Sequence, residues 1–246
     1  MHDISVLCEI GGREHNQDCV KTSQKNGKFC IAVADGLGSY NGSDIASKTA
    51  VEYLVSFFEE NCDSEDLFNK SSISAALHKA HNKILEKKKK DTSIASSCTT
   101  IAFLVSDTVT SVMAHIGDTR IYEIKNGKIL YRTKDHSLAQ VAVDRGEISY
   151  DEISTHQDQN KLIKVLGSDC FIDGDISTDF FALNKGDGFV VCTDGLWEYI
   201  TDKELLEVFK TNDNSCDILN KIKSIHDEKA DEYCDNFSLA VMIKGE

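Results

Sequence analysis

Ile31-Ala32-Val33-Ala34-Asp35-Gly36-Leu37-Gly38 is the stretch of sequence that decides the fold. Its four apolar residues predict a buried strand, and an aspartate and two glycines follow where that strand ends. A carboxylate at the end of a rigid strand, beside a glycine that lets backbone oxygens approach, is typical of a hard-cation site. An Asp-Gly pair after a strand is also ordinary turn chemistry, so this stretch is compatible with both structures.

The same pattern recurs at three other predicted strands. An aspartate follows two further apolar segments and precedes an alternating one; these residues are Asp118, Asp194 and Asp235. Taken singly, each aspartate is better explained as a turn residue. Four carboxylates brought together repel one another unless cations compensate for their charge. Oxygen ligands select Mg²⁺ or Mn²⁺ over zinc, and two such ions can activate water for phosphoryl transfer.

Length and composition predict one globular domain over residues 1–246, with 41% apolar and 28% charged residues and no proline. The formal charge of −14 argues against nucleic acid or an anionic membrane as the main partner. The only basic run, Lys87 to Lys90, stands at a predicted helix end, where it is either a solvated terminus or a docking patch.

The nine cysteines never form a Cys-x-x-Cys pair, which excludes the usual zinc ribbons and offers no disulfide framework. We find no apolar stretch of transmembrane length and no signal peptide at Met1-His2-Asp3. We therefore expect a cytoplasmic protein.

Strands are expected to run consecutively and helices to come in pairs, which indicates an α+β layered fold. Ser43 or Asp44 is predicted to cap the first helix, and a second helix is predicted from about Ser72. Its histidines, His78 and His81, are expected to face solvent.

A polar, mostly helical excursion at about residues 139–160 interrupts the strands. It is either a flap that contacts the substrate or a surface excursion without a function in binding, and the sequence fits both alternatives equally well. Arg13, alone in a polar loop after the first strand, has two equally weighted interpretations: a bidentate phosphate ligand or a surface salt bridge.

Short motifs stand in a defined order along nearly the whole chain: Arg13 with Asn16-Gln17-Asp18, Ala34-Asp35-Gly36-Leu37-Gly38 with Ala46-Ser47, Thr99-Thr100, Ile116-Gly117-Asp118-Thr119-Arg120-Ile121-Tyr122, Thr133-Lys134-Asp135-His136-Ser137, Asn160 with Leu166-Gly167, Cys192-Thr193-Asp194-Gly195-Leu196-Trp197 and Asp235-Asn236. Each motif is weak alone, and the ordered set is specific. It resembles the metal-dependent protein serine/threonine phosphatases, the PPM or type 2C family, and most of all their bacterial branch.

The resemblance implies a four-layer αββα sandwich, with two central mixed β-sheets flanked by helix pairs. It also implies two Mn²⁺ or Mg²⁺ ions per chain, with a third, weaker ion in bacterial relatives. By similarity, Asp35 bridges the two main ions. Asp194 and Asp235 complete the first site, and the carbonyl of Gly36 serves the second.

The resemblance assigns the remaining roles in the same way. Asp118, together with Asp194, matches the position of the third ion, and Asp18 matches a carboxylate that orients metal-bound water. Arg13 matches the phosphate-binding arginine. A metal-bridging hydroxide would attack phosphorus directly, with Arg13, Asp35 and Asp194 as the catalytic set. Phosphorylated proteins are the implied partners, with a serine/threonine kinase as a candidate, and a monomer is the default state.

Four positions depart from the family pattern. Gln17 replaces an acid that supports the second metal in many relatives. Ser39-Tyr40 replaces a glycine-histidine pair, so no histidine proton donor is available there, and Cys98 replaces a glycine. All predicted carboxylate ligands remain, so we expect an active enzyme. Gln17 and Tyr40 keep open a catalytically weak regulatory module that binds phosphoproteins, and a small-molecule phosphoesterase is a further alternative.

Overall fold

The computed structural model describes residues 2–37, 42–171, 173–180 and 182–245. Ser39 and Tyr40, where the sequence departs from the bacterial pattern, lie outside the described residues, as does the neighbouring Gly38. No helix in the described ranges has both the length and the apolar character needed to cross a bilayer.

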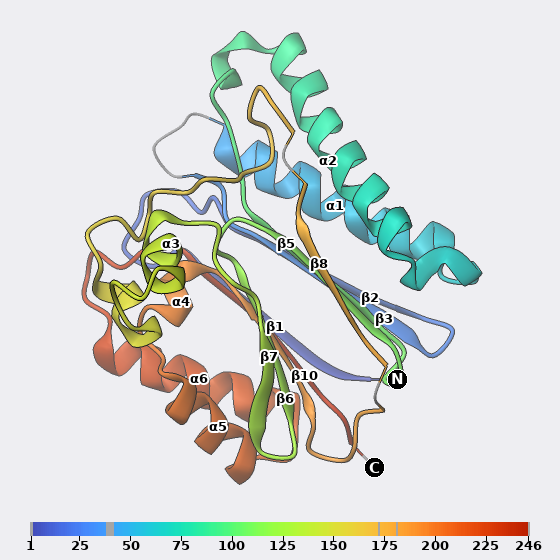
Figure 1. The fold of residues 1–246 in the computed structure, drawn as a ribbon, viewed down its shortest axis with the longest axis vertical. Helices are drawn as coiled ribbons and strands as arrows, with labels where there is room; N and C mark the ends of the chain where they lie inside the picture. The colour runs from blue at the N-terminus through green and yellow to red at the C-terminus, as the bar shows by residue number, and fades with distance from the viewer. Residues whose placement is uncertain (1, 38–41, 172, 181, 246) are drawn as a thin grey trace.

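In the described part of the chain, ten strands form two five-stranded sheets at the centre of the molecule (Figure 1). The strands are β1 (Asp3–Glu9), β2 (Cys19–Lys25), β3 (Lys28–Ala34), β4 (Ile101–Ser106), β5 (Ser111–Ile116), β6 (Arg120–Lys125), β7 (Lys128–Arg132), β8 (Asp175–Asp179), β9 (Gly188–Cys192) and β10 (Phe237–Ile243). One sheet has the order β1-β10-β9-β6-β7, and the other has the order β2-β3-β4-β5-β8.

Helices cover the outer face of each sheet. The helices of the described residues are α1 (Ser43–Asn61), η1 (Glu65–Phe68), α2 (Lys70–Lys90), η2 (Thr92–Ile94), α3 (Leu138–Asp144), η3 (Tyr150–Thr155), α4 (Asp194–Trp197), α5 (Asp202–Thr211) and α6 (Ser215–Lys229). Helices α1 and α2 cover one sheet, and α5 and α6 cover the other (Figure 1). In β3 the apolar side chains alternate: Ala32 packs toward α1 and α2, whereas Ile31 packs between the sheets. A third apolar cluster lies between the other sheet and α5 and α6. The predicted four-layer αββα sandwich is confirmed.

Every strand pairing among the described residues is antiparallel, so the expectation of mixed sheets is wrong. The reason is the pairing of the helices. A single-helix crossover makes neighbouring strands parallel, because the chain returns to the end where it started. Here α1 and α2 together connect β3 to β4, and α5 and α6 help to connect β9 to β10. Two antiparallel helices bring the chain back to the end of the sheet that it left.

The start of α1 also differs from the prediction. The capping residue is Gly42, at φ 76°, instead of Ser43 or Asp44. The Ser43 hydroxyl instead donates to the carbonyl of Leu37 at 2.8 Å. A left-handed cap of this kind favours glycine, so the rule that serine and aspartate cap helices does not identify it.

Helix α2 begins at Lys70, two residues before the predicted start. His78 is exposed as expected, whereas the expectation for His81 is wrong. His81 is buried, and its Nδ1 accepts the backbone N–H of Gly167 at 3.1 Å. The polar pattern of α2 did not identify this contact, because the partner lies 86 residues away in sequence.

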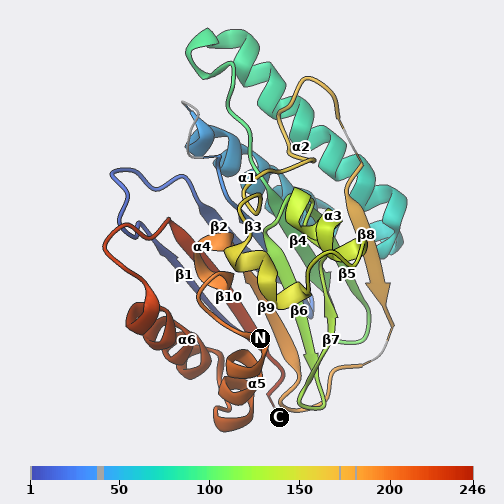
Figure 2. The same ribbon diagram turned by 60° about the vertical axis from the view of Figure 1, so that its left-hand side comes forward.

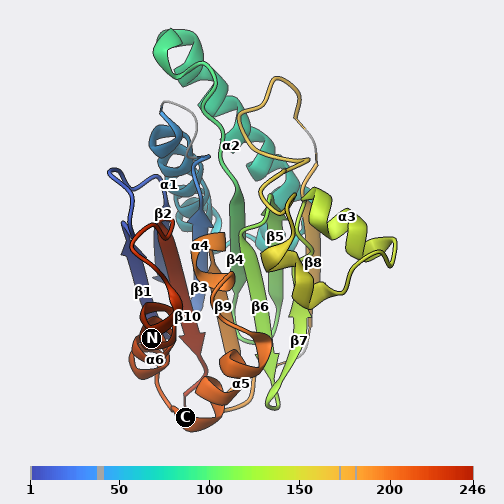
Figure 3. The ribbon, with the colours of Figure 1, turned by 90° about the vertical axis from the view of Figure 1, so that its left-hand side faces the viewer.

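The excursion at residues 139–160 contains most of α3 and all of η3. Figures 2 and 3 show both helices outside the two sheets. A bridge between Ser137 and Leu162 closes the base of the excursion, and the N–H of Leu138 donates to the carbonyl of Lys161. The excursion is therefore anchored where it leaves and rejoins the sandwich.

Candidate metal centre

The aspartates singled out in the sequence lie at one end of the sandwich. Asp35 follows β3, Asp118 follows β5, Asp194 begins α4 directly after β9, and Asp235 precedes β10. One carboxylate oxygen from each of Asp35, Asp118 and Asp194 lies within 4.8 Å of the others. The helix pairs explain this arrangement, because each returns the chain to the same end of its sheet.

Two threonines of the sequence motif hold the backbone of Asp35. Its N–H donates to the hydroxyl of Thr100 at 2.9 Å, and its carbonyl accepts the Thr99 hydroxyl at 2.7 Å. Gly117 has φ 101° and packs against Thr100, where a β-carbon would lie 2.6 Å from the threonine methyl group. The loop before Asp118 therefore requires glycine.

Gly36 lies where no side chain can be accommodated. A β-carbon there would be 2.4 Å from the carbonyl oxygen of Ser43 and 2.8 Å from that of Gln17. The N–H of Gly36 donates to the Gln17 carbonyl, and the N–H of Gln17 donates to the Asn236 side chain. The departure at Gln17 thus leaves the backbone around the acidic cluster firmly held.

Asp18 joins the cluster through the residue that caps α4. The hydroxyl of Thr193 donates to Asp18 Oδ2 at 2.8 Å and accepts the N–H of Ser238 at 2.8 Å. The N–H of Gly195 donates to Asp194 Oδ1 at 2.8 Å. Asp18 and Asp194 are therefore positioned by the same turn.

The carboxyl groups of Asp18, Asp35, Asp118 and Asp194 lie close enough to disturb one another's ionisation. Burial and the nearby Asp194 raise the pKa of Asp18 to about 7, and burial and Asp235 raise that of Asp194 to about 6. Burial and neighbouring carboxylates also raise the pKa values of Asp35 and Asp118 far above the usual range. Oδ1 of Asp18 and Oδ1 of Asp118 are buried without a hydrogen-bond partner among the described residues. Oxygens in this state fit a divalent cation.

A cavity of about 1080 Å³ opens over the cluster. Arg13 lines it and donates to Asp235 Oδ2 at 2.7 Å, with about half of each side chain exposed. The structure thus shows a salt bridge at Arg13, and the same guanidinium lines the cavity, so the two interpretations do not exclude each other. Asp35, Asp118, Asp194 and Asp235 all line this cavity, whereas Asp18 lies behind it among buried residues.

The far wall of the cavity includes residues that were not predicted. Lys88 lines it, and its ammonium donates to the carbonyl of Gly167 at 2.5 Å. It belongs to the basic run at the end of α2, whose other members, Lys87, Lys89 and Lys90, are exposed as expected of a solvated terminus. Lys161 and Cys98 also line the wall. Of the excursion at 139–160, only Asn160 reaches the cavity.

Two further residues support the centre. Burial and the nearby Asp194 and Asp235 raise the pKa of Glu198 to about 8, and no sequence signal marked this residue. Asn236 belongs to the Asp235-Asn236 motif, which gives no role for its side chain. Its amide donates to the carbonyls of Ile10 and His15, so it joins the N-terminal loop to the start of β10.

His115, His136 and Asp175 form a second group whose ligand atoms lie within 4.8 Å of one another. The two imidazoles are stacked, with ring centroids 4.5 Å apart. The N–H of Gly117 donates to Nδ1 of His136 at 3.1 Å, so in the neutral ring Nε2 carries the proton. Nε2 therefore has no lone pair for a metal, and the arrangement is that of a packed histidine pair.

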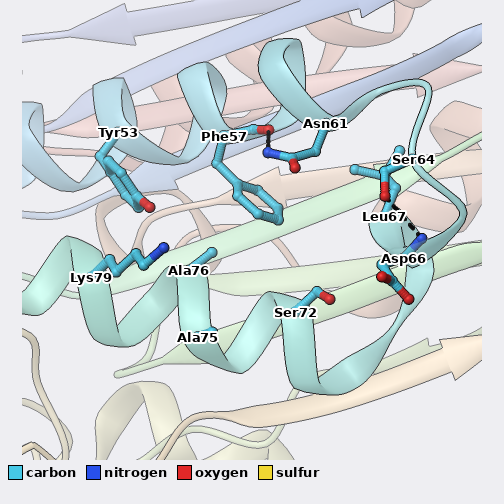
Figure 4. Close-up of a pocket in the computed structure, with 10 residues that line it drawn as sticks. All are labelled: Tyr53, Phe57, Asn61, Ser64, Asp66, Leu67, Ser72, Ala75, Ala76 and Lys79. Atoms are coloured by element: carbon cyan, nitrogen blue, oxygen red, sulfur yellow. Dashed lines mark hydrogen bonds between the residues drawn. The ribbon is translucent and has the colours of Figure 1, made fainter.

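A smaller cavity of about 230 Å³ lies between α1 and α2 (Figure 4). Tyr53 and Phe57 of α1 face Ala76 and Lys79 of α2 across it. No predicted site residue is among the described residues that line it.

Comparisons with known proteins identify the same family that the sequence motifs resemble. A family model described as protein phosphatase 2C matches residues 9–229. The serine/threonine phosphatase stp of Listeria monocytogenes serotype 4b is 24% identical over 237 residues, which covers 94% of this chain and 90% of that protein. The structure of the serine/threonine phosphatase Stp1 from Staphylococcus aureus matches with a TM-score of 0.87 at 22% identity, over 100% of this chain and 96% of that chain.

The catalytic domain of the serine threonine protein phosphatase PstP, solved in complex with two manganese ions, also matches. Its TM-score is 0.80 at 20% identity, and the match covers 99% of this chain and 98% of that chain. At these identities the two solved structures show that the fold is shared.

Proposed function

Because the chain belongs to the protein phosphatase 2C family and is a serine/threonine protein phosphatase, we propose that it hydrolyses phosphoserine and phosphothreonine in proteins with Mn²⁺ or Mg²⁺ at its acidic cluster. The observation that carries the proposal is this cluster. Oxygens of Asp35, Asp118 and Asp194 converge within 4.8 Å, and buried oxygens of Asp18 and Asp118 lack a hydrogen-bond donor among the described residues. Divalent cations offset the charge of such a group while its carboxylates stay ionised.

The donor set fits two hard cations. Asp35, Asp194 and Asp235 and the carbonyl of Gly36 would hold them, and Asp118 would share a third ion with Asp194. Such ions, when bound, lower the pKa of water and neutralise charge on a phosphate. The manganese ions in the PstP structure support this assignment. The choice between Mn²⁺ and Mg²⁺ depends on supply in the cell, because both prefer oxygen ligands.

Water is the proposed nucleophile, so the reaction proceeds without a phosphoenzyme. Cys98 is the thiol that lines the cavity, and burial raises its pKa. A protonated thiol is a poor nucleophile. Asp18 is the proposed residue that would orient the water molecule, and its burial and its hydrogen bond from Thr193 support this role.

Arg13 is the proposed phosphate ligand. Its bond to Asp235 uses one terminal nitrogen, and a guanidinium has five N–H donors in a planar fork. Asp235 therefore orients the group and leaves donors for the phosphate oxygens.

We propose that residues 1–246 form one phosphatase domain, in which residues 139–160 are a flap beside the cavity. The closed base at Ser137 and Leu162 and the position of Asn160 in the cavity wall support this role. A phosphorylated protein segment, from a kinase or one of its substrates, is the proposed partner. The cavity volume of about 1080 Å³ exceeds what a single phosphate needs.

Phosphate release from a phosphothreonine peptide, with and without Mn²⁺, tests the proposal. We expect metal-dependent turnover in the wild type and a loss of at least ~100-fold in Asp194→Asn, because a charge that holds the ions is removed. Asp213→Asn is the matched control, since Asp213 is exposed and lies in the loop between α5 and α6.

Absence of wild-type turnover at any Mn²⁺ or Mg²⁺ concentration would instead favour the regulatory phosphoprotein-binding module. A higher kcat/KM for a small aryl phosphate than for the peptide would favour a small-molecule phosphoesterase.

A further inference from the structure

One buried side chain connects two of the acid-bearing segments. Trp197 is the last residue of α4, the short helix that begins at Asp194 (Figure 2). Its indole N–H donates to the backbone carbonyl of Asp118 at 3.0 Å. Trp197 is 5% exposed and Asp118 is 3% exposed, so water hardly competes for this bond. The bond therefore ties the loop after β5 to α4.

Arg120 in turn holds the indole. The guanidinium carbon lies 3.5 Å from the centroid of the Trp197 ring. Nε and Nη2 of Arg120 donate to the two oxygens of Asp135 at 2.8 and 2.6 Å, and both residues are buried. A bidentate pair fixes the plane of the guanidinium, and a cation over an indole face is attractive. Asp135 therefore orients Arg120, and Arg120 in turn packs against the face of the Trp197 ring and fixes its position.

The position of the Asp118 carboxylate depends on this contact. Its Oδ1 has no hydrogen-bond donor among the described residues, so neighbouring side chains do not orient that oxygen. The backbone of Asp118 is held by Trp197, and Asp194 lies one turn before Trp197 in the same helix. Movement of the indole would change the separation of the two carboxylates.

We propose that Asp135, Arg120 and Trp197 form a brace that sets the spacing of Asp118 and Asp194, and thereby the affinity for the divalent cation that these two carboxylates share. The inference rests on the proposed function, because it assumes that cation. Arg120 and Trp197 are positioning residues, since they act through the backbone of Asp118 and through α4. Loss of a partner that orients metal ligands typically costs 10- to 100-fold in metal affinity.

Calorimetric titration of the full chain with Mn²⁺ tests the brace. Trp197→Phe removes the indole N–H and keeps an aromatic ring over Arg120. We expect it to weaken, by about 10- to 100-fold, the binding step that disappears in Asp118→Asn. The Mn²⁺ concentration for half-maximal turnover should rise by the same factor, while kcat at saturating Mn²⁺ changes little.

Phe209→Leu is the matched control. Phe209 is buried in the same apolar cluster as Trp197, so the variant loosens the core and leaves the brace intact. We expect it to bind Mn²⁺ like the wild type. The inference is overturned if Trp197→Phe binds Mn²⁺ with wild-type affinity, or if Phe209→Leu loses as much Mn²⁺ affinity as Trp197→Phe. The proposed function stands in either case, provided that the wild type shows metal-dependent turnover. A wild type that binds no Mn²⁺ overturns both.

A second measurement decides the matter if Trp197→Phe does not fold. Trp197 is the single tryptophan of the chain, so the fluorescence of the wild type reports on the brace. Titration with Mg²⁺ should change the emission along the binding curve that calorimetry gives for Mg²⁺, and Asp118→Asn should abolish the change. Emission that stays constant at saturating Mg²⁺ contradicts the inference.

Discussion

Asp18→Asn should stabilise the metal-free protein at alkaline pH. Asp18 is 9% exposed and lies beside Asp194. When a chelator has removed divalent cations from the wild type, no bound metal ion offsets the charge of either carboxylate. An asparagine amide still accepts the Thr193 hydroxyl that bonds Asp18 Oδ2, and it removes one negative charge from the cluster. The native fold therefore loses repulsion and keeps its hydrogen bond.

The size of the effect follows from the pKa of Asp18, which burial and Asp194 raise from 3.8 to about 7. Below pH 3.8 the carboxyl is protonated in both the folded and the unfolded chain, so the destabilisation is absent. It grows as the pH rises and is complete above about pH 7, where it reaches up to about 4 kcal/mol. About 3 kcal/mol of it arises between pH 5 and pH 8.

Urea unfolding in the presence of a chelator, followed by circular dichroism, measures this difference. The free energy of unfolding of Asp18→Asn should exceed that of the wild type by a margin that widens from pH 5 to pH 8. Asp213→Asn, at an exposed position, should follow the wild type. Added Mn²⁺ should narrow the margin, because cations relieve the same repulsion. A margin that is constant with pH, or a variant less stable than the wild type at pH 8, would refute the reasoning.

Three further predictions concern the surroundings of the cluster. Gly36→Ala places a β-carbon 2.4 Å from a backbone oxygen of α1 and should lower the free energy of unfolding by about 1–3 kcal/mol, measured in urea; wild-type stability would contradict this. Arg13→Ala removes a half-exposed partner of Asp235 and should raise the KM for a phosphopeptide with little change in melting temperature; an unchanged KM would exclude the phosphate role. His81→Leu leaves the buried N–H of Gly167 without an acceptor and should cost about 1–3 kcal/mol, which thermal unfolding with amide exchange at Gly167 can test.

The sequence predicted the acidic end of the sandwich well, because its signals are local. Asp35 and Asp194 follow buried strands, and strand periodicity places each carboxylate at a strand end. The helix-pair pattern predicted the layers. The antiparallel direction of the strands follows from the number of helices in each crossover, whereas the family resemblance implied mixed sheets.

The parts that the sequence did not predict depend on contacts between distant segments. His81 has polar neighbours in the sequence, but it is buried in the structure. Lys88 was predicted as part of a helix end, and it lies in the cavity wall. Glu198 carries no motif, and its pKa is raised first by burial and then by Asp194, four residues before it, and by Asp235, which precedes β10. Side-chain periodicity contains no information on such contacts.

The place of β10 has a consequence for the synthesis of the enzyme. This strand pairs with β1 on one side and β9 on the other, and Asp235 immediately precedes it. A ribosome-bound chain that has not yet released residues 235–243 lacks both the Asp235 carboxylate and the strand that joins β1 to β9. Such a chain has no assembled acidic centre, so the centre can form only after residues 235–243 have left the ribosome.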